Sequence, residues 1–88
     1  MKHVYEAECA FAGIDARQVE RISRRLSAAG RDAAALGLTI FGGSGHGTLR
    51  IHDDPKKGAL IVAEIAGRFD GGDGGYGPSQ DGLNRGEV

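Results

Sequence analysis

The sequence predicts a small single α+β domain, in which an antiparallel sheet carries helices on one face. Three observations predict it. A segment of alternating polarity precedes a segment of helical periodicity, a glycine-rich turn separates two β-rich runs, and a segment with a helix-start signal follows them. The expected order is β-α-β-β-α, which is that of the first five elements of a ferredoxin-like fold. We expect residues 1–69 to form this domain and residues 70–88 to form a flexible, glycine-rich tail.

The first predicted element is a strand over residues 5–11. Apolar side chains occupy every second position, and Glu6 and Glu8 between them would face solvent. The alternating residues are Tyr5, Ala7, Cys9 and Phe11. Gly13 interrupts this pattern, and Asp15 then occupies the capping position of a helix.

The second predicted element is a helix over residues 16–29, which Gly30 ends. Its apolar residues form one stripe at 100° per residue, and this stripe is expected to lie on the sheet. The stripe consists of Val19, Ile22, Leu26 and Ala29. Residues 31–37 are expected to form a short helical turn or a loop.

A β-hairpin is predicted next, with strands in the runs "LTIFGG" and "GTLRIHD" and the glycine loop "GGSGHG" at its tip. The loop lacks the lysine of a phosphate-binding loop, because Thr48 stands in its place. It also lacks the last glycine of a nucleophile elbow, where His46 stands. The loop is therefore interpreted as a turn that exposes Ser44 and His46 to a partner. Ser44, His46 and an acid at position 53 or 54 are the only residues that suggest hydrolytic chemistry.

The segment 55–69 allows two interpretations. Asp54 followed by Pro55 is typical of a helix start, whereas Ile61 and Val62 are β-branched and favour a strand. We favour the helix, because the apolar residues of the segment share one face of a helical wheel.

Composition excludes several classes of protein. The chain has 11 Lys and Arg against 12 Asp and Glu, so it has no uniform positive field of the kind that histone-like proteins use to bind nucleic acid. A single cysteine, Cys9, permits neither an internal disulfide nor a cysteine-based zinc site. No signal peptide or membrane span is recognisable, and a cytoplasmic location is expected. We expect no catalytic residue, cofactor or metal.

The predicted helix carries arginines on the side opposite its apolar stripe, within an arc of about 100°. They are Arg17, Arg21, Arg24 and Arg25, and Arg31 follows just beyond. Such a row is either an ordinary solvated face or a binding surface, since the planar guanidinium group binds carboxylates and phosphates with two hydrogen bonds. With Ser44 and His46, these five arginines are the candidate partner-binding residues. We expect a non-enzymatic module that binds a protein, and a small nucleic-acid-binding regulator is the alternative.

In size, in its single α/β domain and in the separation of its arginine row from its acidic segments, the chain resembles small phage-encoded inhibitors of host defence. The resemblance is to anti-CRISPR proteins that act on type I systems. It implies a stoichiometric inhibitor that binds a subunit of a CRISPR surveillance complex and blocks recognition of target DNA. It covers residues 1–70 and assigns no functional residue.

Overall fold

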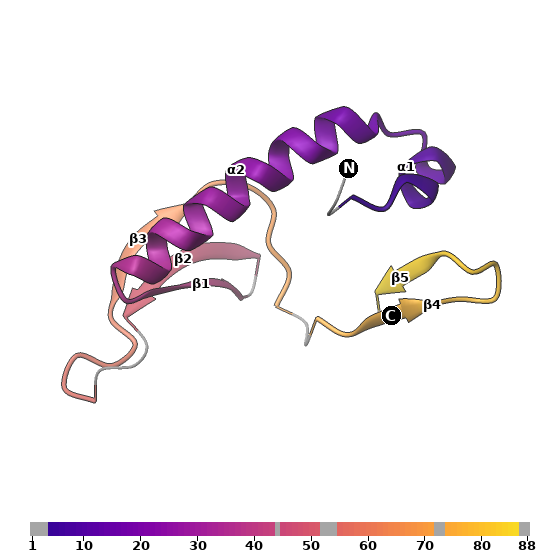
Figure 1. Ribbon diagram of the computed structural model, residues 1–88. Helices are drawn as coiled ribbons and strands as arrows, with labels where there is room; N and C mark the ends of the chain where they lie inside the picture. Colours follow the sequence, from indigo (N-terminus) through magenta and orange to yellow (C-terminus); the bar gives the residue numbers. More distant parts are fainter. Residues whose placement is uncertain (1–3, 44, 52–54, 72–73, 87–88) are drawn as a thin grey trace. The chain divides into compact units, whose positions relative to one another are not determined.

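The computed structural model describes residues 4–43, 45–51, 55–71 and 74–86. Within these ranges the chain forms two α-helices and five β-strands, so the predicted α+β class is confirmed (Figure 1). The helices precede all the strands, however, and the predicted order β-α-β-β-α is wrong. The chain divides into two compact units, one formed by residues 1–27 and 74–88 and the other by residues 28–73.

Helix α1, Glu6–Ala12, lies where the sequence predicted a strand over residues 5–11, and that prediction is wrong. Alanine and glutamate favour a helix, and this segment contains no β-branched side chain that would favour a strand. Glu6 and Glu8 lie in the first turn, where their charge stabilises the positive end of the helix dipole. Gly13 ends the helix in the left-handed conformation, with a φ of 71°.

Helix α2, Ala16–Ala35, begins where the sequence predicted. The Asp15 carboxylate accepts a hydrogen bond of 2.9 Å from the backbone N–H of Arg17, one of the groups that have no partner within the helix. The predicted end at Gly30 is wrong. The alanine-rich segment that follows outweighs the cost of about 1 kcal/mol that glycine carries inside a helix. The helix ends instead before Gly37, whose φ is 75°.

Strands β1, Leu38–Gly43, and β2, His46–Ile51, pair antiparallel and confirm the predicted hairpin around the glycine loop. Gly45 in the turn has a φ of 80°, a conformation that favours glycine. Ser44, and the predicted end of the second strand at residues 52–53, lie outside the described residues.

Strand β3, Ile61–Ile65, pairs antiparallel with β2 and completes a three-stranded sheet of order β1-β2-β3. The helix predicted over residues 55–69 is therefore wrong, because the β-branched side chains at the centre of the segment favour the strand. Pairing extends beyond β3, since the N–H of Ile51 donates to the carbonyl of Leu60 at 3.0 Å. Ala59, with a φ of 60°, lies in the turn that precedes β3.

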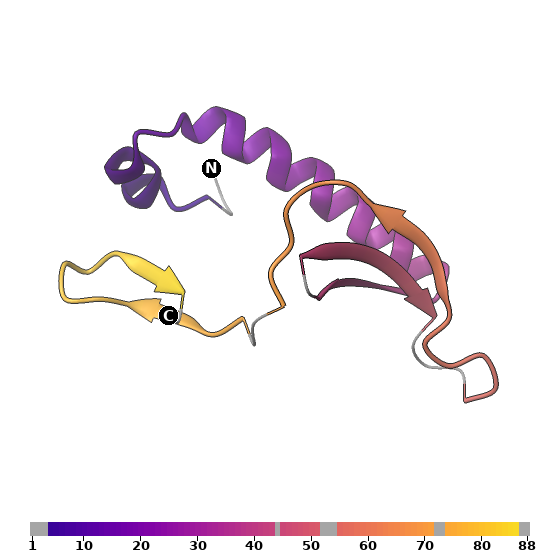
Figure 2. The ribbon, with the colours of Figure 1, turned by 180° about the vertical axis from the view of Figure 1, so that it is seen from behind.

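The C-terminal part of α2 lies against one face of this sheet, as two opposite views show (Figures 1 and 2). Ala33 of this part is buried, and a Cβ placed on Gly30 would lie 4.0 Å from the Cδ1 atom of Ile40. The predicted covering of one sheet face by a helix is thus confirmed for α2. Of the predicted apolar stripe, Ile22 and Leu26 are 55% and 58% exposed.

The ring of Phe69 packs against two glycines of the hairpin. Gly42 and Gly47 lie directly opposite each other in the register of β1 and β2. A Cβ on Gly47 would lie 2.5 Å from the Cε2 atom of Phe69, and a Cβ on Gly42 would lie 3.1 Å from its Cβ atom. A Cβ at Gly47 would force the ring to move, and a Cβ at Gly42 would require Phe69 to give way by a few tenths of an ångström. These two glycines of the loop sequence therefore allow the ring to lie close to the hairpin backbone, in addition to any role in the turn.

A second hairpin lies where the sequence predicted a flexible tail over residues 70–88. It consists of strands β4, Tyr76–Pro78, and β5, Asn84–Gly86, which pair antiparallel. Its turn is held by the N–H of Ser79, which donates to the carbonyl of Leu83 at 2.9 Å. Polar contacts of this kind compensate for the small number of apolar groups in the segment.

Candidate functional site

Four of the five predicted arginines gather on the first half of α2. Together with Glu20 they line one shallow surface hollow of ≈ 590 Å³. We call this surface the arginine face, and its members are Arg17, Arg21, Arg24 and Arg25. All four are exposed. Successive members are four, three and one residues apart, and this spacing places them along one side of the helix.

One member of the arginine face, Arg24, forms an ion pair within α2. The guanidinium Nη2 atom of Arg24 lies 2.9 Å from the Oε1 atom of Glu20, one helical turn before it. Among the described residues, Arg17, Arg21 and Arg25 make no ion pair. Arg31 is exposed on the same helix but does not line the hollow. The arginine face therefore presents three guanidinium groups that are available to an anionic partner.

The glycine loop contributes fewer candidate binding residues than the arginine face. His46 is exposed at the start of β2 and shares a hollow of ≈ 370 Å³ with Glu64 of β3. Ser44, Asp53 and Asp54, with which His46 would have to form a hydrolytic group, lie outside the described residues. In the described part of the chain no cluster of three or more His, Cys, Asp or Glu side chains could hold a metal ion.

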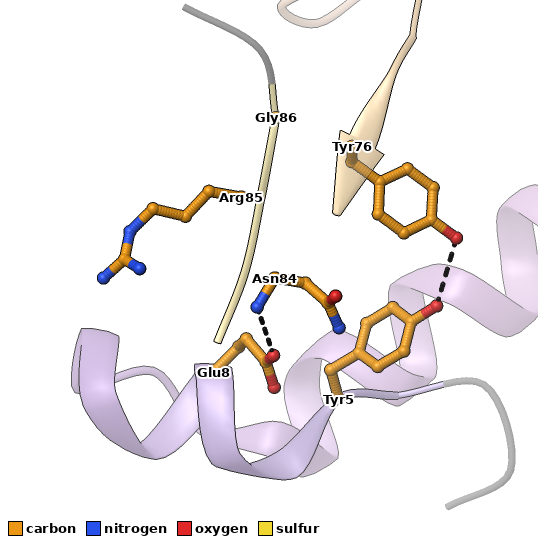
Figure 3. A pocket seen from close by; sticks show the side chains of 6 residues that line it. All are labelled: Tyr5, Glu8, Tyr76, Asn84, Arg85 and Gly86. Carbon is orange, nitrogen blue, oxygen red and sulfur yellow. Dashed lines mark hydrogen bonds between the residues drawn. The ribbon is translucent and has the colours of Figure 1, made fainter. Parts of the chain in front are cut away.

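A further site, which the sequence did not predict, lies between α1 and the second hairpin (Figure 3). The backbone N–H of Asn84 donates a hydrogen bond of 2.7 Å to the Oε2 atom of Glu8, and the hydroxyl groups of Tyr5 and Tyr76 lie 3.3 Å apart. The hollow measures ≈ 420 Å³, and it is lined by Tyr5, Glu8, Tyr76, Asn84, Arg85 and Gly86.

Arg85 connects this site to the turn of the second hairpin. Its Nη1 and Nη2 atoms donate to the two carboxylate oxygens of Asp81 at 2.8 Å and 2.9 Å, and it also contacts the hydroxyl of Ser79. The Arg85 hydrogen bonds hold the pKa of the Asp81 carboxyl well below its usual value. The guanidinium carbon of Arg85 lies 5.6 Å from the centre of the Phe11 ring of α1.

The pKa of Tyr5 is raised, first by its hydrogen bond with Tyr76 and then by the charge of that neighbour. Sequence reasoning missed this site because its partners are 71 to 76 positions apart along the chain. The available signal was the spacing of Ser79, Asp81 and Arg85, which is typical of a side-chain-stabilised turn.

Comparison of the chain with protein-family models, with curated proteins and with solved structures finds no match.

Among the helices formed by the described residues, none combines the length and the apolar character that crossing a bilayer requires.

Proposed function

We propose that this chain is a protein-binding module that acts by association rather than by catalysis, and that the arginine face of α2 is its contact surface. The observation that carries the proposal is the state of these arginines. Three of the four are exposed and make no ion pair among the described residues, and they lie on one side of one helix. Exposed guanidinium groups without an ion-pair partner can form bidentate hydrogen bonds with carboxylates of a partner.

Glu20 favours a protein over a nucleic acid as the partner. It lies within the arginine face and neutralises Arg24, which lowers the positive field that a phosphate backbone would meet. A carboxylate among arginines suits a protein surface that itself carries both signs of charge. The alternative, a small nucleic-acid-binding regulator, uses the same arginines and predicts binding to bare duplex DNA that weakens steeply with salt.

Charge reversal at two unpaired arginines tests the surface. The double variant Arg17→Glu and Arg21→Glu is expected to abolish binding to the partner in calorimetry, because it replaces attraction by repulsion at the centre of the contact. The double variant Lys56→Glu and Lys57→Glu changes the net charge by the same amount at the turn before β3, and it should bind as the unaltered chain does. Equal binding by both variants would place the contact surface elsewhere.

The resemblance to anti-CRISPR proteins extends the proposal to a class of partner, a subunit of a type I CRISPR surveillance complex. The purified complex, its target duplex and the full chain are sufficient for the test. We expect one chain per complex to prevent the duplex from binding, and the Arg17→Glu, Arg21→Glu variant to lose this inhibition. Unchanged duplex binding at excess chain contradicts this class of partner but leaves the arginine face open to other proteins. A shift of the bare duplex by the chain alone supports the nucleic-acid alternative.

A further inference from the structure

The hollow between α1 and the second hairpin carries two exposed aromatic rings. We call it the tyrosine hollow, and it is lined by Tyr5, Glu8, Tyr76, Asn84, Arg85 and Gly86, which all belong to one compact unit. Tyr5 and Tyr76 are 53% and 65% exposed, and their hydroxyl groups lie 3.3 Å apart. In the described part of the chain, arginine side chains lie over the rings of Phe41 and Phe11, and none lies over a tyrosine. The two tyrosine rings therefore have no cation of their own.

Glu8 supplies a carboxylate to the same hollow. Its Oε2 atom accepts the hydrogen bond of 2.7 Å from the N–H of Asn84, and its Oε1 atom has no hydrogen-bond partner among the described residues. Each oxygen of a carboxylate accepts more than one hydrogen bond, so Glu8 keeps the capacity to accept from a donor outside the chain. A positively charged donor forms the stronger bond with it, because both groups then carry charge.

The guanidinium group of Arg85 also lines the hollow, but it is bound to Asp81. Its two terminal nitrogens donate to both carboxylate oxygens of Asp81, and its side chain points away from the two tyrosines (Figure 3). Asp81 is ionised at neutral pH, because the hydrogen bonds with Arg85 lower the pKa of its carboxyl. The carboxylates of Glu8 and Asp81 thus outnumber the one guanidinium group, and this excess of negative charge favours a cation over an anion as the ligand.

We propose that the tyrosine hollow binds an alkylammonium group, whose N–H groups donate to Glu8 and whose carbon atoms lie against the tyrosine rings. Aromatic rings attract a cation through the negative potential of their faces. A hollow of ≈ 420 Å³ is larger than a bare metal ion needs, and within the described ranges no cluster of three or more His, Cys, Asp or Glu side chains exists to hold one. The ligand has the opposite charge to a partner of the arginine face, so this inference does not depend on the proposed function.

Tyrosine fluorescence of the full chain tests the proposal, because both tyrosines line the hollow and the chain has no tryptophan. We expect butylammonium to change the emission in a saturable manner, with a midpoint of about 1 mM. The neutral molecule 1-butanol has the same number of non-hydrogen atoms and should give no such change. The methylamide of Nα-acetyl-lysine carries the same ammonium group. Binding of this compound at least as tight as that of butylammonium indicates a lysine side chain as the ligand, and weaker binding indicates a free small molecule.

Two pairs of variants assign the binding to the ring and to the carboxylate. Tyr76→Phe and Tyr76→Leu both remove the hydroxyl that is bonded to Tyr5, but only Tyr76→Leu removes the ring. We expect Tyr76→Leu to bind butylammonium about threefold more weakly than Tyr76→Phe does. Glu8→Gln should bind it about fivefold more weakly than Glu6→Gln, which removes an equal charge from the same turn of α1 but outside the hollow.

Three results overturn the proposal. No saturable change of tyrosine emission with either ammonium compound means that the hollow binds no such cation. Equal effects of butylammonium and 1-butanol mean that the rings bind apolar groups irrespective of charge. Equal affinities of Tyr76→Phe and Tyr76→Leu mean that the ring is no part of the site. If Glu8→Gln detaches the second hairpin, which faster hydrogen exchange at the amide of Asn84 reveals, the two Tyr76 variants still decide.

Discussion

The two hairpins of this chain are held by different forces. The β1–β2 hairpin is held by packing, because Phe69 lies on Gly42 and Gly47 and β3 pairs along its second strand. The β4–β5 hairpin is held by polar contacts, chiefly the two hydrogen bonds from Arg85 to Asp81 and the contact of Asn84 with α1. The difference shows that a short segment poor in apolar groups can take up regular structure when its charged side chains bond to one another.

The two kinds of support predict different responses to substitution. A packed contact fails when volume is added, and its failure spreads through the sheet. A polar contact at the surface fails when one partner is neutralised, and the effect stays local. Substitutions in the two hairpins test this contrast.

The substitution Gly47→Ala is expected to destabilise the three-stranded sheet by about 1–3 kcal/mol, because the new Cβ would lie 2.5 Å from the Phe69 ring. Chemical denaturation measures the loss. Gly43→Ala is the matched control, since nothing lies within 4 Å of its Cβ position. Combining Gly47→Ala with Phe69→Leu should recover part of the loss. Equal stability of the Gly47→Ala and Gly43→Ala variants would show that Phe69 does not pack on the hairpin.

The substitution Glu8→Gln is expected to weaken the attachment of β5 to α1 by about 1 kcal/mol, because a neutral amide oxygen accepts a weaker hydrogen bond from the N–H of Asn84. Hydrogen exchange at the amide of Asn84 should become faster. Glu6→Gln removes an equal charge from the same first turn of α1 and separates this effect from that of the helix dipole. Equal exchange rates in the two variants would contradict the contact.

Sequence reasoning succeeded where burial on one face sets the pattern. The hairpin around the glycine loop and the start of α2 at Asp15 follow from local signals, which are alternation of polarity and a capping side chain. It failed at α1, because alternation over seven residues also arises by chance in an alanine- and glutamate-rich segment. For residues 55–69 we gave more weight to the helix-start signal of Asp54 and Pro55 than to the β-branched residues at the centre of the segment. The structure has a strand there, β3, which pairs with β2.

The candidate site was predicted in part. The arginine face follows from helical periodicity alone, and its four members are neighbours on α2. The ion pair of Arg24 with Glu20 was also within reach of the sequence, because the two residues are one turn apart. The hollow between α1 and the second hairpin was not, since it depends on contacts between the two ends of the chain.

Acid is expected to loosen the turn of the second hairpin. The pKa of Asp81 is lowered from its usual value of 3.8, chiefly by its hydrogen bonds with Arg85, so the folded state favours the carboxylate. This contribution is fully present above about pH 5. It decreases as the pH falls below 3.8 and is lost once the pH has fallen through the lowered pKa. The amide of Leu83, which donates to Asp81 at 3.1 Å, should report the change in nuclear magnetic resonance titration. Asp81→Asn should remove the response, and a response that persists would assign it to another group.

The smallest expected effect concerns the tyrosine pair of the second hairpin and α1. The hydrogen bond between the two hydroxyl groups raises the pKa of Tyr5, so Tyr76→Phe should return this pKa towards its ordinary value. Alkaline titration by ultraviolet absorbance measures the shift in the variant, where Tyr5 is the remaining tyrosine. Gly77→Ala leaves both hydroxyl groups in place, has no atom within 4 Å of its Cβ, and should keep the raised pKa. An ordinary pKa for Tyr5 of the unaltered chain would mean that the second hairpin is not held beside α1 in solution.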